Sequence, residues 1–285
     1  MRRTNGARVA LVALVLAVAL AVVGGVIWAG LALWSGTTKT PLPLDDQCVA
    51  SSEGASVAVT LEQAHNAAII SAVGLRRGLP ARAVTIALAT TYQESGIRNL
   101  DYGHADSIGL FQQRPSKGWG TVKQIMDPYY SAGKFYDALL GVKNWRTRDV
   151  NDVAQAVQRS AHPEAYRKHV SKARALSAAL TGVAPGGFTC KAGSSEQADG
   201  KGLAAMVRKG LGSEVTITRT EQGLVIEGST HQRAWAAAHL AIAYADEFGV
   251  RKVSLGGADW THDTRTLAEW TGTGSGRIVT VGLSS

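Results

Sequence analysis

The first strong pattern in the sequence is an apolar run near the N-terminus. Three arginines fall within the first eight residues, and residues 9–34 then contain no charged side chain. As a helix these 26 residues would extend about 39 Å, more than the ~30 Å hydrocarbon core of a bilayer. Trp28 and Trp34 would suit the membrane interface. We expect a transmembrane signal anchor over residues 9–34 with a cytoplasmic tail at 1–8; the alternative is a signal peptide cleaved near Gly36.

Helical patterns dominate the middle of the chain. Residues 60–63 form a capping-box sequence, Thr-Leu-Glu-Gln, and Pro80 opens a second, very apolar helix. The segment 99–120 is rich in Gly, Asp and Ser, which favours loops and a small β-hairpin. Helical spacing resumes over residues 131–140, 150–159 and 164–180. We therefore expect a mainly α-helical domain over residues 59–182, behind a tether of Ser, Thr, Pro and Lys at 35–58.

The pattern changes after residues 183–202, a stretch rich in Gly and Ser that predicts a second linker. Apolar and polar residues alternate at 215–218, and a Gln-Gly turn leads into a short apolar run at 224–226, which predicts a hairpin. One helix and two further strands follow. Residues 203–285 are thus expected to form a small α+β module that carries no catalytic motif, and the fold class of the whole chain is α+β.

Two cysteines, Cys48 and Cys190, flank the expected helical domain. Neither has another Cys or a His nearby at metal-ligand spacing, so we expect no metal, and outside the cytoplasm a disulfide bond is the economical interpretation. The net charge of +8 and the pI near 9.6 would suit a polyanion. Because Lys and Arg are scattered along the sequence, we expect no nucleic-acid partner. The sequence shows no phosphate-binding loop, and we expect no cofactor.

The candidate chemistry lies at the end of the second helix. Glu94 follows a run of small and apolar residues and precedes Gly96, which can end a helix. Burial among apolar side chains raises the pKa of a carboxyl, and a carboxyl still protonated near neutral pH can donate a proton to a glycosidic oxygen. The alternative for a single glutamate is an ordinary surface position at a helix end.

Thirteen residues after Glu94 a second motif begins, because residues 107–112 read Ser-Ile-Gly-Leu-Phe-Gln. Gly109 would let the backbone approach a ligand closely, and Gln112 offers both a donor and an acceptor to sugar hydroxyls. Taken alone, this motif also fits an ordinary turn followed by a short strand.

Together the two motifs resemble the lysozyme-like superfamily, in particular the soluble lytic transglycosylases and the goose-type lysozymes, over residues 83–179. The resemblance implies that Glu94 is catalytic and that the second motif forms a hairpin flooring a sugar-binding groove. It further implies substrate contacts for Ser95, Ser107, Gly109, Leu110, Gln112 and Tyr166.

Two parts of that resemblance leave alternatives open. Lytic transglycosylases carry an Ala-Tyr-Asn whose tyrosine lies near the acid, whereas this chain has Ala165-Tyr166-Arg167, so Tyr166 belongs either to the groove or to a core. Goose-type lysozymes use aspartates to place water. Asp101 and Asp106 lie between the motifs and are candidates for a second carboxylate or, alternatively, for loop caps.

These observations predict a membrane-anchored enzyme of the bacterial cell envelope. It would cut the β-1,4 bond between N-acetylmuramic acid and N-acetylglucosamine in peptidoglycan with Glu94 as its one catalytic acid, giving either a 1,6-anhydro end or hydrolysis. The alternative is a non-catalytic wall-binding protein or a structural component of an envelope-spanning secretion or conjugation apparatus. Glycan strands and, through residues 9–34, the membrane are the expected partners; the sequence indicates no protein partner.

Overall fold

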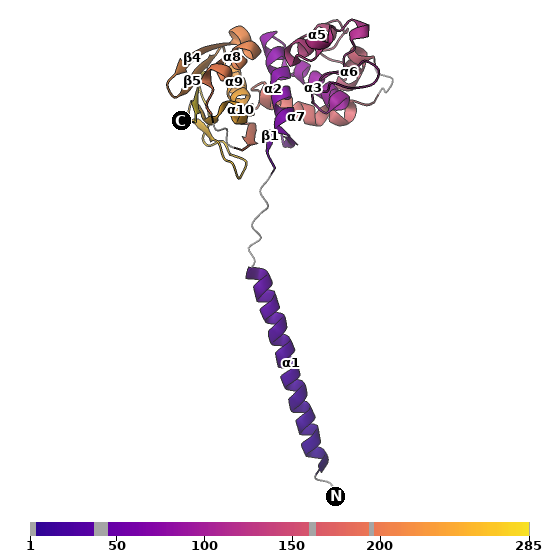
Figure 1. Cartoon of the computed structure of the whole chain (residues 1–285), viewed down its shortest axis with the longest axis vertical. Coiled ribbons are helices and arrows are strands. Elements are labelled where there is room, and N and C mark those ends of the chain that lie inside the picture. Colours follow the sequence, from indigo (N-terminus) through magenta and orange to yellow (C-terminus); the bar gives the residue numbers. More distant parts are fainter. Residues whose placement is uncertain (1–3, 37–44, 160–163, 194–196, 285) are drawn as a thin grey trace. The chain divides into compact units, whose positions relative to one another are not determined.

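The computed structural model describes residues 4–36, 45–159, 164–193 and 197–284. The chain divides into two units, Met1–Pro43 and Leu44–Ser285, and the first contains the helix α1 (Thr4–Gly36) (Figure 1). Across the described ranges, no helix meets the length and apolarity that crossing a bilayer requires. The transmembrane helix expected over residues 9–34 is therefore not found there. Residues 37–44 of the expected tether lie outside the described part of the chain.

The second unit begins with a strand pair and continues as a helical half, which confirms the helical patterns of the sequence. Thr60 caps α2 as its capping box predicts, because its hydroxyl accepts from the Gln63 amide at 3.3 Å while the Gln63 side chain accepts from the Thr60 amide at 2.9 Å. The elements are β1 (Gln47–Ser52), β2 (Ala55–Val59), α2 (Leu61–Arg76), α3 (Ala81–Ser95), the 3₁₀ turn η1 (Pro115–Lys117), α4 (Val122–Ile125), α5 (Pro128–Leu140), α6 (Val150–Gln158), the 3₁₀ turn η2 (Arg167–His169), α7 (Val170–Leu180) and β3 (Phe188–Lys191).

A three-stranded antiparallel sheet in the order β2-β1-β3 closes this half and packs against α7. Cys48 on β1 lies opposite Cys190 on β3, and the expected disulfide joins them with Cα atoms 3.9 Å apart. The linkers expected at 35–58 and 183–202 are therefore wrong where they cover these strands. Residues of β1 and β2 alternate between buried and more exposed positions, which suits a strand against helices better than a tether. Residues 194–196 lie outside the described part.

The remaining elements form a second, five-stranded antiparallel sheet in the order β4-β5-β8-β6-β7, with α9 packed against it. The expected hairpin is present as β4 and β5, which confirms the change of pattern in the sequence. The elements are α8 (Gly200–Leu211), the 3₁₀ turn η3 (Gly212–Glu214), β4 (Val215–Thr220), β5 (Gly223–Gly228), α9 (His231–Ala243), α10 (Ala245–Phe248), β6 (Val250–Leu255), β7 (Ala258–Thr261) and β8 (Ile278–Leu283). The fold class is α+β, as expected.

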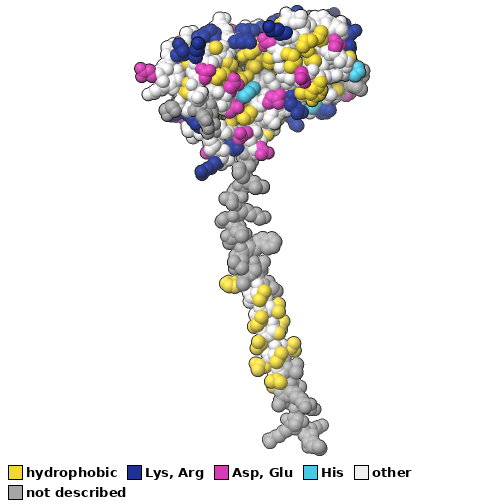
Figure 2. Space-filling view, viewed as in Figure 1, with side chains coloured by type: hydrophobic (Ala, Val, Ile, Leu, Met, Phe, Trp, Pro, Cys, Tyr) yellow, Lys and Arg dark blue, Asp and Glu magenta, His cyan; other side chains and the backbone are white. Residues whose placement is uncertain are grey.

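Charged side chains are spread over the second unit. On the face shown in Figure 2, Lys and Arg lie among Asp and Glu and do not form one continuous patch. Several are paired, as Arg233 is with Glu214 at 2.6 Å. The excess of positive charge therefore does not by itself define a binding face.

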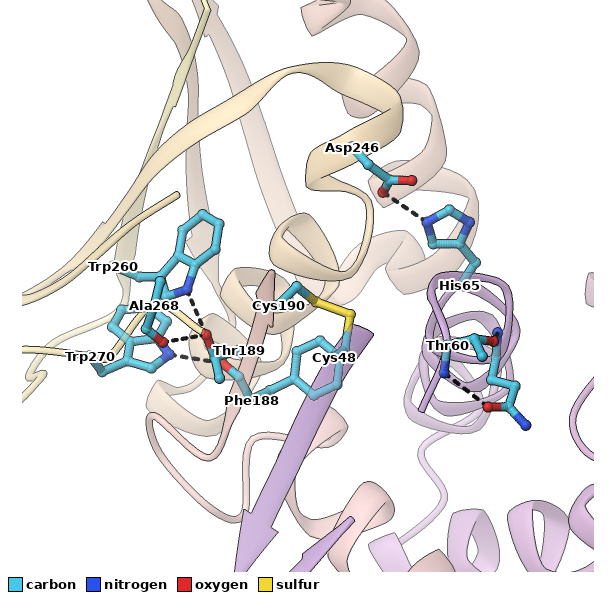
Figure 3. Close-up of a disulfide and its surroundings, with 11 residues drawn as sticks. Cys48, Thr60, His65, Phe188, Thr189, Cys190, Asp246, Trp260, Ala268 and Trp270 are labelled. Atoms are coloured by element: carbon cyan, nitrogen blue, oxygen red, sulfur yellow. Dashed lines mark hydrogen bonds and ion pairs between the residues drawn. A yellow bond between two sulfur atoms is a disulfide. The ribbon is translucent and has the colours of Figure 1, made fainter. Parts of the chain in front are cut away.

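The two halves of the second unit share one core, and strand β3 connects them (Figure 3). The indole N–H of Trp260 donates to the Thr189 hydroxyl at 2.9 Å, and that of Trp270 donates to the Phe188 carbonyl at 2.9 Å. Helix α2 packs against α8 and α9. Residues 203–284 therefore belong to the same compact body as the helical half, which corrects the expectation of a separate module behind a linker.

Candidate active site

Helix α3 carries Glu94 on its last turn. The helix is buried along most of its length, as its apolar sequence predicts, and Gly96 ends it in the left-handed conformation with φ of +64°. Glu94 is half-buried at this end, where a bound molecule can reach its carboxyl.

Two neutral donors hold the carboxyl of Glu94. The Tyr166 hydroxyl donates to Oε1 at 2.7 Å. Burial raises the pKa of Glu94 above its ordinary value, and the hydrogen bonds from Tyr166 and Gln158 lower it in part. Burial is the largest of these causes, so the net shift favours the protonated acid. This is the state that the sequence predicts for a proton donor.

Tyr166 itself is fully buried. Its ring belongs to the core, which is one of the two alternatives for this residue, and its hydroxyl reaches the carboxyl of Glu94. It does not line the cleft described below, and substrate contact by Tyr166 stays a prediction.

Ser95 ties the end of α3 to the second motif. Its hydroxyl donates to the carbonyl oxygen of Leu110 at 2.7 Å, and both residues are buried. The amide of Gln158, which also hydrogen-bonds Glu94, donates to the carbonyl oxygen of Phe111 at 2.8 Å. The structure thus brings together the two motifs that the sequence places thirteen residues apart. Ser95 and Leu110 act here as parts of the framework.

The second motif forms a tight hairpin turn, with Ile108 and Gln113 paired through both backbone hydrogen bonds at 3.0 Å. Gly109 adopts φ of +79°, and a Cβ there would lie 3.0 Å from the carbonyl oxygen of Ile125, so a larger residue would be strained. Gln112 donates through Nε2 to the carbonyl oxygens of Tyr102, at 3.2 Å, and Gly109, at 3.3 Å. The side chain of Gln112 is therefore already oriented at the cleft wall.

Glu94 opens into a cleft of about 870 Å³. Of the expected site residues, Glu94, Ser107 and Gln112 line it, whereas Ser95, Gly109, Leu110 and Tyr166 lie behind its wall. The other described residues that line it are His104, Arg114, Lys117, Trp119, Ala138, Val157, Gln158 and Arg159.

Several of the residues that line the cleft were not predicted from the sequence. Trp119 stands between two glycines, seven residues after the end of the hairpin motif, and this aromatic in a segment rich in small and polar residues was a usable signal for a sugar-binding surface. Gln158 had no such signal, because it ends an ordinary amphipathic helix 64 residues after Glu94.

The two candidate second carboxylates lie elsewhere. Asp106 accepts from the Ser116 amide at 2.8 Å and from Arg114 Nε at 2.6 Å, and the hydrogen bonds from Ser116 and Arg114 hold its pKa below the ordinary value. Asp101 is exposed. Neither lines the cleft, so Glu94 is the one carboxyl among the described lining residues.

No group of three or more His, Cys, Asp and Glu in the described part of the chain could hold a metal ion. No protein-family model matches the chain, and no curated protein matches it. The function proposed next therefore rests on the residues of the cleft and on the two motifs.

Proposed function

We propose that this protein is a lysozyme-like enzyme that cleaves the bond between N-acetylmuramic acid and N-acetylglucosamine, with Glu94 as its general acid. The observation that carries the proposal is Glu94, the one carboxyl among the described residues that line a cleft of about 870 Å³, half-buried and with a raised pKa. Trp119 offers an aromatic face to a sugar ring, and Ser107 and Gln112 offer polar groups to its hydroxyls.

In this mechanism protonated Glu94 gives its proton to the glycosidic oxygen while the bond from that oxygen to C1 breaks. Ionised Glu94 then takes the proton of the muramoyl 6-hydroxyl, whose oxygen bonds to C1. The product has a 1,6-anhydro end, no water is consumed, and Glu94 returns to its protonated state. Between the two transfers, the donors Tyr166 and Gln158 stabilise the carboxylate.

The surroundings of Glu94 favour this outcome over hydrolysis. An inverting glycosidase needs a second carboxylate about 6.5–9.5 Å from the acid to activate water. Asp106 is held by Arg114 and the Ser116 amide and does not line the cleft, and Glu94 is the one acidic residue among the described residues of the cleft wall.

Mass spectrometry of fragments released from purified peptidoglycan tests the proposal. The wild-type protein should release anhydro-muropeptides, and Glu94→Gln, which keeps the shape of the side chain without its acidic proton, should release at least ~100-fold less. Hydrolysed products would be heavier by one water. Their release would show that the enzyme is a muramidase and not a lytic transglycosylase. If neither protein releases fragments but both bind the wall equally, the non-catalytic wall-binding alternative is correct.

We also propose that residues 9–34 anchor the enzyme in the membrane, with the cleft outside the cytoplasm. The support is the sequence alone, namely 26 residues without a charge behind three arginines. The intact mass of cell-associated protein tests this. A product that begins near Gly36 and is released to the medium would contradict it.

A further inference from the structure

The charges that line the cleft are strongly unequal. Four side chains that carry or can carry a positive charge lie on its wall, namely His104, Arg114, Lys117 and Arg159. Their only acidic counterpart among the described lining residues is Glu94, whose raised pKa favours its neutral form. On the face shown in Figure 2, Lys and Arg lie among Asp and Glu. The described wall of the cleft therefore carries more cationic side chains than acidic ones.

Two of these cations are available to a ligand. Lys117 and Arg159 are exposed, and neither forms an ion pair with another described residue. Arg114 differs, because its Nε already contacts Asp106 at 2.6 Å. A charge without a partner at the rim of a cleft attracts an oppositely charged ligand without first losing an internal contact.

Arg159 is placed at the cleft by the end of helix α6. Arg159 follows the last turn of α6 with φ of +53°, a left-handed conformation in which glycine is normally favoured. The preceding residue, Gln158, is fixed to both Glu94 and the Phe111 carbonyl, so this corner is held in place next to the acid. The backbone therefore places Arg159 at the cleft wall beside Gln158 and Glu94, where its side chain can contact a bound ligand.

We propose that Lys117 and Arg159 bind carboxylates carried by the muramic acid residues of the glycan, so that the cleft selects anionic strands over neutral ones. This inference rests on the proposed function and names the feature of the substrate that these two side chains recognise. The carboxylate has two chemical sources. It is the lactyl group itself on strands without peptides, or a carboxylate of the attached peptide on strands that retain them.

Binding of three soluble glycan strands to the full-length chain, in the Glu94→Gln background so that the strands stay intact, tests the proposal. The first strand is peptide-free with lactyl carboxylates, the second is the same strand with these groups converted to neutral amides, and the third retains its peptides. We expect at least one of the two anionic strands to bind about five-fold or more tightly than the neutral strand. The preference should shrink at high salt.

A pair of charge-matched variants assigns the preference to the cleft. Lys117→Gln combined with Arg159→Gln should abolish it, whereas Lys123→Gln combined with Lys143→Gln removes the same charge from exposed positions that do not line the cleft and should retain it. Preference for the first strand identifies the lactyl group as the source, and preference for the third alone identifies the peptide.

Equal affinity for the charged and neutral strands, or a preference that survives loss of Lys117 and Arg159, would overturn the inference. If anhydro-muropeptides are still released by the wild-type protein in that case, the proposed enzyme stands without this selectivity. Absence of binding to any strand, together with absence of cleavage, would overturn both.

Discussion

Burial shifts the pKa of a titratable side chain in both halves of the second unit, with different consequences. Glu94, at the end of α3, is half-buried, keeps two hydrogen-bond donors and faces a cleft. His239, in the middle of α9, is fully enclosed, donates through Nδ1 to the Ala179 carbonyl at 2.7 Å and has no partner at Nε2. Phe188, Trp235 and Trp270 surround its ring.

The difference separates a group that a ligand can reach from one that is enclosed. Burial raises the pKa of Glu94 toward the range where it can exchange a proton with a ligand, and the cleft supplies the access. Burial lowers the pKa of His239 to about 4, so this ring stays neutral and packs as part of the core. A perturbed pKa therefore indicates chemistry only where solvent or a ligand can reach the group.

The largest test concerns how far the two halves depend on one another. A chain that ends at Gly193 keeps both cysteines but loses α8, α9 and the sheet that cover α2, together with the Trp260 and Trp270 contacts to β3. Exposing that apolar surface should abolish cooperative folding.

Circular dichroism with thermal unfolding measures this, and the full-length chain is the reference. A fragment that unfolds cooperatively near the midpoint of the full-length chain would show that residues 203–285 are separable, as the sequence alone suggested.

The second test removes the acid. Glu94→Gln should lower the turnover of peptidoglycan at least ~100-fold, equivalent to about 2.7 kcal/mol, while the unfolding midpoint is retained or rises at neutral pH because a buried carboxyl is gone. Glu62→Gln, an exposed change on α2, is the matched control. Full turnover by the Glu94 variant would remove this residue from the mechanism.

Local signals explain what could be predicted from the sequence. The burial of Glu94 follows from its apolar helix and the adjacent Gly96, and the pairing of Cys48 with Cys190 was expected from an even count of cysteines in a domain predicted to lie outside the cytoplasm. Both depend on features that a short stretch of sequence or simple composition carries.

Long-range packing explains what could not. The contact of Gln158 with the acid joins residues on two helices, and the shared core depends on tryptophans that meet β3 from 71 and 82 positions away. Strands β1 and β3 also lie in segments rich in Ser, Thr and Gly, where composition favours linkers. Their pairing with each other, across 142 residues at the disulfide, stabilises them as strands.

The third test changes the enclosed histidine. His239→Ala leaves a cavity and loses the hydrogen bond to the Ala179 carbonyl, so it should lower the free energy of unfolding by about 2 kcal/mol or more. Turnover per folded molecule should be unchanged. A loss of turnover with normal stability would contradict the purely structural role.

The decrease in the free energy of unfolding caused by His239→Ala should also depend on pH. The pKa of His239 falls from 6.5 to about 4 on burial, so between these values the unfolded chain binds a proton that the folded chain does not. The stability that neutral His239 gives the wild-type protein is present in full above pH 6.5, and it is lost as pH falls toward 4. Denaturant unfolding should therefore show the two proteins converging in stability at low pH, and a constant difference would contradict the assignment.

The smallest effect on turnover is expected from a change to Tyr166, which donates a hydrogen bond to the carboxyl of Glu94. Tyr166→Phe removes the hydroxyl that contacts Glu94 Oε1 but leaves Gln158 in place, so turnover should fall about ten-fold, equivalent to ~1.4 kcal/mol. Loss of a donor to the carboxylate raises the pKa of Glu94 further. The alkaline limb of kcat/KM against pH should therefore move to higher pH.

Tyr166→Phe should also change how the stability of the folded chain depends on pH. The folded pKa of Glu94 already lies above its ordinary value of 4.5, so the folded chain binds the extra proton between the two values and loses stability as pH rises through that window. Tyr166→Phe should extend the window upward, which urea unfolding at a series of pH values would detect. Tyr136→Phe, which loses a buried hydrogen bond to the Ile70 carbonyl away from the cleft, should be destabilised without moving either profile. If both variants move the kcat/KM profile alike, or neither does, Tyr166 does not tune the acid and serves only the core.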